Sequence, residues 1–224
     1  MILNKKFGKI SYSQCGEDLI MAFLLEQIGI TNVVYLDIGA HHPYLFSNTY
    51  YFYKRGDRGI CVEPDVSLYK EIDKRRPRDV SINSGVGASN TKMTLFIFEP
   101  STLNTFSKSE RDRYSKIGHK QVSEQSVPIY TIDKILIKSN MSKDDVNLVS
   151  LDVEGMDLEI LKSINFNKFR PEIFCVETLE YTNKQPRKLK SIIRLMEKNG
   201  YYSYADTYIN TIFVDKQKFR GAKN

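Results

Sequence analysis

The sequence is poor in cysteine, with three among its 224 residues. Cys15, Cys61 and Cys175 are odd in number and far apart, which argues against a disulfide framework and against a zinc site. Cys61 and Cys175 stand in apolar runs, so we predict that both are buried in strands. This usage of cysteine is typical of a reducing compartment.

Long hydrophobic runs are also missing. No segment reaches the roughly 18 apolar residues that span a bilayer, so we expect no integral membrane segment. The apolar run Leu19–Leu25 follows the polar stretch Ser11–Asp18, whereas a signal peptide would carry a basic start and a cleavage site. We therefore expect a cytoplasmic protein.

The glycine patterns that bind phosphate are absent as well. The chain contains no G-x-x-x-x-G-K-[ST], which excludes a P-loop. It also contains no G-x-G-x-x-G, the pattern with which dinucleotide-binding domains hold a pyrophosphate at the start of a helix. A nucleotide bound through its phosphates is therefore not expected.

Charge of either sign is not in large excess, because 33 basic and 27 acidic residues leave a net charge of +6. The hydrophobic content of 41% is enough for a globular core and argues against disorder. Lys70–Arg78, one of the two densest basic stretches, is interpreted as a solvated helix face. Contact with nucleic acid or an anionic membrane is the less favoured alternative.

Short apolar runs alternate with helical patterns along the chain. The predicted core strands are Val33–Ile38, Arg58–Glu63, Val80–Val86, Val146–Val153 and Glu172–Glu177, followed by an antiparallel pair at Tyr201–Tyr204 and Thr211–Val214. The predicted helices are Gln14–Gln27, Tyr50–Arg55 (with Ser47–Thr49 as its cap), Val66–Arg76, Asp133–Lys138, Asp157–Ile164 and Lys188–Lys198. This alternation indicates an α/β fold with a doubly wound, mostly parallel sheet.

One region interrupts the alternation. Strands predicted at Met93–Phe98 and Val127–Tyr130 flank the polar stretch Ser101–Glu124, which is too small for a core of its own. We predict a lid-like insertion over approximately residues 99–126. The chain is then a single domain over residues 1–224, with an N-terminal helical segment over approximately residues 1–30.

Acidic residues stand where the predicted strands end, which is where ligands bind in sheets of this kind. They are Asp37, Glu63, Asp152 with Glu154, and Glu177. Gly39 follows the first strand and permits a tight turn with close approach of a ligand. An acid at the end of the second strand is positioned to hydrogen-bond a ribose diol.

The first strand-end loop favours a nucleoside without phosphate. Residues 37–43 read D-I-G-A-H-H-P, and a single glycine followed by a proline makes a poor phosphate cradle. S-adenosylmethionine (SAM) needs no such cradle, and its sulfonium and α-amino group are cations that suit acidic strand ends. Each pattern alone is also ordinary turn chemistry, but their order on successive strands favours the cofactor interpretation.

With these patterns in place, the chain resembles the FkbM family of SAM-dependent methyltransferases. The residues that carry the resemblance are S-Q-C-G-E-D at Ser13–Asp18, D-I-G-A at Asp37–Ala40, S-N-T at Ser47–Thr49, C-V-E-P-D at Cys61–Asp65, V-G at Val86–Gly87 and L-D-V-E-G at Leu151–Gly155. It covers about Ser11 to Val214. It implies a class I, Rossmann-like fold with a seven-stranded, mostly parallel sheet and an antiparallel C-terminal edge strand.

The resemblance also implies the contacts to SAM. Asp37, Gly39 and Ala40 would line its methionine and ribose end, Glu63 would bind the ribose hydroxyls, and Pro64 with the turn Asn83–Gly87 would flank the adenine. The full set of expected cofactor-binding residues is Gln14, Glu17, Asp37, Gly39, Ala40, His41, Asn48, Glu63, Pro64, Val86, Gly87 and Asp152.

Transfer to a hydroxyl needs a positioned base, because a neutral hydroxyl is a poor nucleophile. Asp152, Glu154 and His42 are the preferred catalytic candidates, and His41 and Glu177 are further ones. His42 is equally well interpreted as a polar loop residue. A divalent ion on Asp152, Glu154 and a histidine is the less favoured alternative, although carboxylates are ligands that Mg²⁺ prefers.

The sequence therefore predicts a SAM-dependent O-methyltransferase with a small-molecule or glycan acceptor. The preference for a saccharide hydroxyl, and with it polysaccharide modification, comes from the resemblance alone. A nucleic-acid methyltransferase is one alternative, favoured by a pI near 9.0 but opposed by the absence of [DNS]-P-P-[YF], so we expect no nucleic-acid partner. A non-catalytic nucleotide-binding protein is the other alternative.

Overall fold

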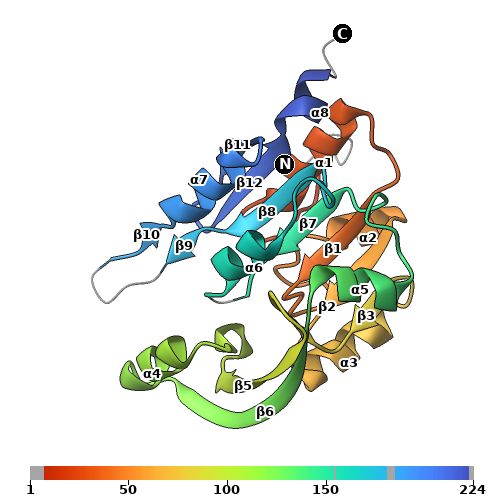
Figure 1. Cartoon of the computed structure of the whole chain (residues 1–224). Helices are drawn as coiled ribbons and strands as arrows, with labels where there is room; N and C mark the ends of the chain where they lie inside the picture. The colour runs from red at the N-terminus through yellow and green to blue at the C-terminus, as the bar shows by residue number, and fades with distance from the viewer. Residues whose placement is uncertain (1–7, 154, 181–184, 222–224) are drawn as a thin grey trace, which may run out of the picture.

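The computed structural model describes residues 8–153, 155–180 and 185–221. Within these ranges, the short apolar runs form a seven-stranded sheet that crosses the molecule (Figure 1). Its strands are β1 (Val34–Ile38), β2 (Arg58–Val62), β3 (Val80–Ile82), β7 (Leu148–Leu151), β8 (Ile173–Glu177), β11 (Tyr201–Asp206) and β12 (Asn210–Asp215). Cys61 and Cys175 are buried in β2 and β8, as predicted.

The order of the sheet is β3-β2-β1-β7-β8-β12-β11. The first five of these strands run parallel, and β12 runs antiparallel to both β8 and β11. This topology confirms the doubly wound, mostly parallel α/β fold, with β12 as the antiparallel strand one position in from the edge strand β11. The order reverses between β1 and β7, the place at which such sheets bind ligands.

Helices cover both faces of the sheet, so that it is the middle of three layers. Apolar side chains of α5 (Ile132–Ser139), α6 (Asp157–Ser163) and α7 (Lys190–Lys198) pack on one face. Those of α1 (Glu17–Ile28), α2 (Tyr50–Arg55) and α3 (Val66–Arg75) pack on the other. Successive side chains of a strand point to opposite faces of the sheet and so pack against both helix layers. Leu36 of β1 packs in the first core and its neighbour Tyr35 in the second.

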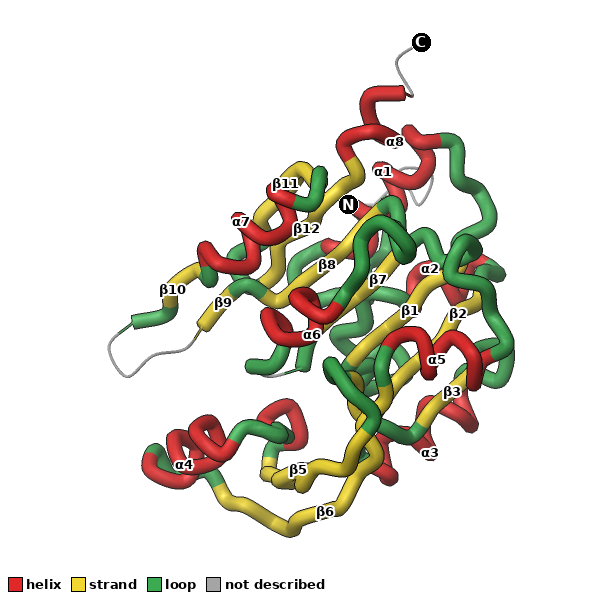
Figure 2. The backbone as a smooth tube through the Cα atoms, viewed as in Figure 1, coloured by secondary structure: helices red, strands yellow, loops and turns green. Residues whose placement is uncertain are grey.

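The insertion predicted after the third strand is a folded arm, which we define as residues 91–130 (Figure 2). It contains β5 (Thr91–Glu99), a short 3₁₀ helix η1 (Ser101–Leu103), α4 (Lys108–Lys116) and β6 (Lys120–Tyr130). β5 and β6 pair antiparallel along their whole length and bow away from the body. Phe96, Phe98 and Tyr114 form a small core within the arm.

Two sequence predictions are wrong in this region. Val80–Val86 is not one strand, because β3 ends at Ile82 and Gly85–Val86 forms β4, which pairs with β6 instead. The side chain of Asn83 turns the chain by donating to the carbonyl oxygens of Glu63 and Pro64, both at 2.9 Å. The strand predicted at Val127–Tyr130 is also too short, because β6 begins at Lys120, and the polar stretch before it holds η1 and α4.

The remaining described elements come after β8 in the chain. They are the two-stranded pair β9 (Leu179–Glu180) and β10 (Arg187–Lys188), and the helix α8 (Lys216–Gly221). Among the described residues, no helix is both long enough and apolar enough to cross a membrane.

Candidate functional site

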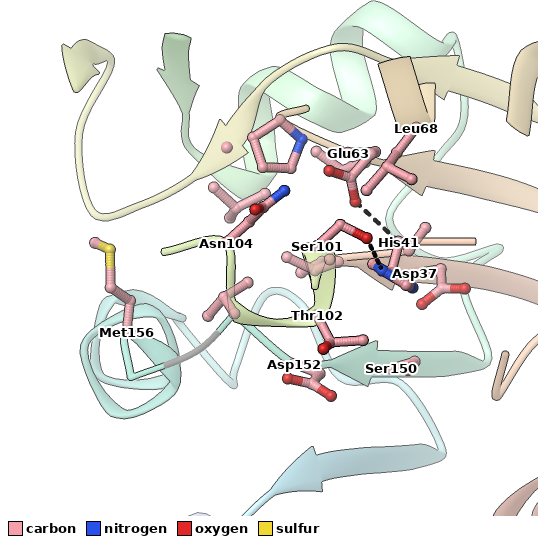
Figure 3. A pocket seen from close by; sticks show the side chains of 18 of the residues that line it. Asp37, His41, Glu63, Leu68, Ser101, Thr102, Asn104, Ser150, Asp152 and Met156 are labelled. Atoms are coloured by element: carbon pink, nitrogen blue, oxygen red, sulfur yellow. Dashed lines mark hydrogen bonds between the residues drawn. The ribbon is translucent and has the colours of Figure 1, made fainter. Parts of the chain in front are cut away.

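A cavity opens where β1, β2 and β7 end. Parallel register places Ile38 beside both Val62 and Leu151, so the residues that follow these three positions meet at one edge of the sheet. The predicted residues that line the cavity are Gln14, Asp37, Gly39, Ala40, His41, Asn48, Glu63, Pro64, Val86 and Asp152. The arm closes the opposite side with Ser101, Thr102 and Asn104 (Figure 3). Ten of the twelve cofactor-binding residues expected from the sequence thus line one cavity.

Gly39 sets the shape of the first loop. Its φ of +80° is in the left-handed region, and a Cβ built there would lie 1.8 Å from the carbonyl oxygen of Asp152. The amides of Gly39 and Ala40 both donate to the carbonyl oxygen of Val62, at 3.0 and 3.2 Å. The loop therefore touches the ends of β2 and β7 at once, and a side chain at position 39 has no room.

Glu63 is the carboxyl that organises the cavity. Its Oε2 accepts from the backbone N–H of His41 and its Oε1 from that of Asp65, both at 2.8 Å. Burial raises the pKa of Glu63 to about 8; the two N–H donors lower it, and the carboxylates of Asp65 and Asp37 raise it further. Glu63 therefore carries a proton through much of the neutral range in the ligand-free protein.

This shifted pKa predicts how stability depends on pH. Between about pH 4.5 and 8 the folded protein holds a proton at Glu63 that the unfolded chain has lost, so the free energy of unfolding falls as pH rises through this window. A glutamine at this position cannot titrate. We expect Glu63→Gln to gain stability relative to the wild type from pH 5 to pH 9, measured by chemical unfolding. A difference in the free energy of unfolding between the two proteins that stays constant with pH would contradict the raised pKa of Glu63.

Asp37 lines the cavity at the end of β1 and is held by a buried polar network. Its Oδ2 accepts from the hydroxyl of Thr49 at 2.5 Å, and Arg76 in turn donates to that hydroxyl at 2.9 Å. Burial raises the pKa of Asp37, while the Arg76 charge and the Thr49 hydroxyl oppose the rise. Asp37 is thereby fixed in orientation where the first strand ends.

Arg76 is the central residue of this network, and sequence reasoning missed it. Its side chain is fully buried and its Nε lies 2.7 Å from Oδ2 of Asp79, whose other oxygen accepts from the Tyr35 hydroxyl at 2.7 Å. The solvated-face interpretation of Lys70–Arg78 is therefore wrong at this residue. Pro77 was the available signal, because the residue before a proline leaves the helix and its side chain points in another direction.

The predicted cap of α2 uses its three residues for different purposes. The hydroxyl of Ser47 accepts from the backbone N–H of Tyr50 at 3.1 Å and so caps the helix. Thr49 takes the N-cap position, but its hydroxyl donates to Asp37 rather than capping. The amide of Asn48 reaches across to the hydroxyl of Ser150 on β7 at 3.2 Å. The segment therefore joins the helix to the cavity.

Asp152 follows β7 and its side chain faces the cavity from below Thr102 of the arm (Figure 3). Asp157 is buried behind it, with Oδ1 accepting from the backbone N–H of Val153 at 3.2 Å. Burial and the neighbouring charge of Asp152 raise the pKa of Asp157 to about 7. Glu154, the other predicted base of this loop, lies outside the described residues.

Among the residues that are described, no three His, Cys, Asp or Glu side chains gather as a metal site.

The two adjacent histidines have different environments. The ring of His41 lines the cavity and its Nε2 lies 3.1 Å from the hydroxyl of Ser101, which ties the first loop to the arm. Burial and the neighbouring His42 lower the pKa of His41. His42 is turned onto its own loop, where its Nδ1 accepts from the backbone N–H of Leu45 at 2.9 Å, and it is not among the residues that line the cavity.

Three further candidates lie beside the cavity rather than in its lining. Glu17 is fully buried at the start of α1. Gly87 joins β4 to β6, because its N–H donates to the carbonyl oxygen of Tyr130 at 3.0 Å. Glu177 ends β8 next to Asn210 of β12.

Arm residues were missed because they lie in the stretch without a hydrophobic pattern. Asn104 donates to Oδ2 of Asp65 at 3.0 Å and accepts from the backbone N–H of Phe98 at 2.9 Å, which fixes η1 over the cavity. Ser84 at the turn after β3 also lines the cavity, and its buried hydroxyl has no partner among the described residues. An unpaired buried hydroxyl is costly, so a ligand atom is its expected partner.

The lining is acidic although the chain is basic. Asp37, Glu63 and Asp152 contribute carboxyl groups, whereas no lysine or arginine is present among the described residues of the lining. The chain as a whole carries +6. Such a cavity favours a cationic or neutral ligand, because an anion would meet carboxyl groups and no cationic side chain of the described lining in a partly desolvated place.

Comparison with known families agrees with this chemistry. The sequence profile described as the methyltransferase FkbM domain matches residues 37–202, from β1 to β11. The chain belongs to the FkbM methyltransferase family. The S-Q-C-G-E-D segment lies before the matched region. The FkbM methyltransferases use SAM, and the acidic cavity of this chain suits a nucleoside that carries a sulfonium and an ammonium group.

Solved methyltransferase structures show distant likenesses. A precorrin-6y C5,15-methyltransferase from Geobacter metallireducens GS-15 is 12% identical with a TM-score of 0.43, over 88% of this chain and 87% of that one. A magnesium protoporphyrin IX methyltransferase from Synechocystis PCC 6803, solved with bound SAM, is 9% identical with a TM-score of 0.44, over 88% and 76%. Likenesses of this size are too distant to transfer a substrate. Comparison with curated proteins gave no significant match.

Proposed function

We propose that this FkbM methyltransferase moves the methyl group of SAM to a hydroxyl oxygen of a saccharide or a related small metabolite. The observation that carries the proposal is the group of three carboxyls at the ends of β1, β2 and β7, in a lining whose described residues include no lysine or arginine. The saccharide preference follows from the resemblance of the sequence. Three cysteines without a disulfide support a cytoplasmic location.

In this proposal, different residues of the cavity contact different parts of the cofactor. The carboxyl of Glu63 accepts from the ribose hydroxyls, and Asp37 and the loop Gly39–His41 line the ribose and methionine end. Pro64 and Val86 flank the adenine, and the unpaired hydroxyl of Ser84 is available at the same turn. When bound, SAM supplies an electrophilic methyl group on a sulfonium. The protein itself supplies orientation and exclusion of water.

Asp152 is the proposed base. It faces the cavity, whereas His42 is bonded to its own loop, so we assign to Asp152 the removal of the proton from the acceptor hydroxyl. Asp157 is buried behind it, and burial together with the neighbouring Asp152 raises the pKa of Asp157 to about 7, so Asp157 is partly protonated near neutral pH. Thr102 of the arm lies next to the same carboxylate (Figure 3).

Replacing this base separates catalysis from binding. We expect Asp152→Asn to lower kcat by about 10²–10⁴-fold, the usual contribution of a positioned base. The affinity for S-adenosylhomocysteine (SAH) should fall less than about tenfold, because the backbone N–H of Asp152 keeps its bond to Ile38. Turnover and calorimetric binding measure the two effects. An equal loss in both would mean that Asp152 only binds the cofactor.

The direct test is incubation with methyl-labelled SAM and separate panels of neutral saccharides, small hydroxyl metabolites, RNA and DNA. Label in a saccharide or metabolite is the expected result. Label in nucleic acid would instead support the alternative that the basic pI suggests. Tight binding of SAH with no transfer to any panel would refute the acceptor, and no binding of SAM or SAH would support a non-catalytic protein.

A further inference from the structure

The polar segment before α1 is folded by a single buried carboxylate. Asp18 accepts hydrogen bonds from the hydroxyl of Ser11 at 2.7 Å, the backbone N–H of Tyr12 at 2.7 Å and the hydroxyl of Ser13 at 3.0 Å. Its own helix contributes the N–H of Leu19 at 2.8 Å. These bonds wrap residues 11–16, which we call the N-terminal loop, around the start of the helix.

Glu17 fastens the same loop to the other end of the chain. Its Oε2 accepts from the backbone N–H of Cys15 at 2.8 Å. Its Oε1 accepts from the hydroxyl of Thr207 at 2.6 Å, in the turn after β11, and from the amide of Asn210 at 3.1 Å, at the start of β12. Burial raises the pKa of Glu17, but the hydrogen bonds from Thr207, Asn210 and Cys15 outweigh it and the pKa is lowered. Glu17 is thus a charged anchor rather than a free ligand.

Gln14 belongs to the N-terminal loop that Asp18 and Glu17 hold in place, and it lines the cavity. It precedes α1, which begins at Glu17 rather than at Gln14 as predicted. The lining includes two other primary amides, but Asn48 donates to Ser150 and Asn104 donates to Asp65. Gln14 is the amide of the described lining that has no such protein partner.

The chemistry of SAM makes a neutral amide useful here. One end of the cofactor carries an α-carboxylate, which requires N–H donors, and the described lining offers no lysine or arginine for it. We propose that Glu17 is a positioning residue that holds the N-terminal loop so that the Gln14 amide meets the carboxylate end of SAM. The inference rests on the proposed cofactor site. It adds Glu17 as a residue that supports this site without contacting the cofactor.

A double-mutant cycle tests whether Glu17 acts through Gln14. We expect Gln14→Ala and Glu17→Gln each to weaken SAH binding about tenfold, the size of one hydrogen bond to a charged group. The double variant should bind SAH no more weakly than Gln14→Ala, because the anchor has nothing left to position. A double variant weakened about 100-fold, the product of the single effects, would overturn the proposal. Unchanged binding in Glu17→Gln would also overturn it.

A matched variant separates positioning from general stability. Asp215 is equally buried on β12 and accepts from Arg170 at 2.7 and 3.0 Å, at the end of the strand away from the cavity. We expect Asp215→Asn to lower the melting temperature as much as Glu17→Gln does and to leave SAH affinity unchanged. Equal weakening of SAH binding by both variants would overturn the proposal.

A milder variant covers the case in which Glu17→Gln does not fold. Thr207→Val removes only one donor to Glu17, and we expect it to weaken SAH binding about threefold, with no further effect in the Gln14→Ala background. Failure of the wild type to bind SAH would refute the proposed cofactor site itself. Normal wild-type binding with an additive cycle would refute the role of Glu17 alone.

Discussion

Replacing Arg76 by alanine is expected to cost about 3–5 kcal/mol of the free energy of unfolding. The guanidinium is fully buried, and its removal leaves the Asp79 carboxylate buried without its countercharge. It also removes the donor to Thr49, so the orientation of Asp37 in the site loosens. We expect Arg76→Lys to recover little, because one ammonium does not reproduce the two-directional contacts of the guanidinium. Chemical unfolding measures the loss.

The preceding residue provides the control. Arg75 is more than half exposed, and its Nε lies 3.6 Å from Glu71 in a surface pair within α3. Arg75→Ala should change the free energy of unfolding by no more than about 0.5 kcal/mol. If Arg76→Ala loses less than about 1 kcal/mol of the free energy of unfolding, the attractions within the buried network only offset the cost of taking its charges out of water.

The second large effect is expected at Gly39. An alanine there would place its Cβ 1.8 Å from the Asp152 carbonyl oxygen in a left-handed backbone conformation. Overpacking and the left-handed conformation together cost about 3 kcal/mol or more. The loop has to move away from β7, and a shift of about 1 Å in a binding loop can cost about 100-fold. We therefore expect SAH binding to Gly39→Ala to fall at least that far, measured by calorimetry.

Gly29 separates the two causes of this loss. It ends α1 with a φ of +86°, close to that of Gly39, but a Cβ there would have nothing within 4 Å. Gly29→Ala should therefore lose about 1–2 kcal/mol from the backbone conformation and keep its affinity for SAH. Similar losses of stability in both variants would mean that the contact with Asp152 relaxes easily.

The core of the fold and much of the site could be predicted from the sequence, because both depend on local order along the chain. Each buried strand is a short apolar run, and in a parallel sheet successive runs must end at one edge. An acid placed just after each run therefore gathers with the others. Asp37, Glu63 and Asp152 were found in this way.

The rest depends on partners that are distant in the sequence. Lys120–Gln125 is polar on both faces, so only pairing with β5 makes it a strand. Arg76 belongs to a basic run, and its burial follows from the facing Asp79 and Thr49. Glu17 is an acid near the cavity like the others, but contacts 190 or more residues away in the chain direct its carboxylate elsewhere. No local pattern contains this information.

The arm leaves the body and returns to it at almost one point, since Thr91 and Gly85 are both paired with Ile129. It also has a small hydrophobic core of its own, formed by Phe96, Phe98 and Tyr114. A piece of chain with these two properties depends little on the central sheet for its own packing. We therefore expect sequence changes in the arm to alter the side of the cavity that Ser101, Thr102 and Asn104 close, while the strand ends on the other side keep their arrangement.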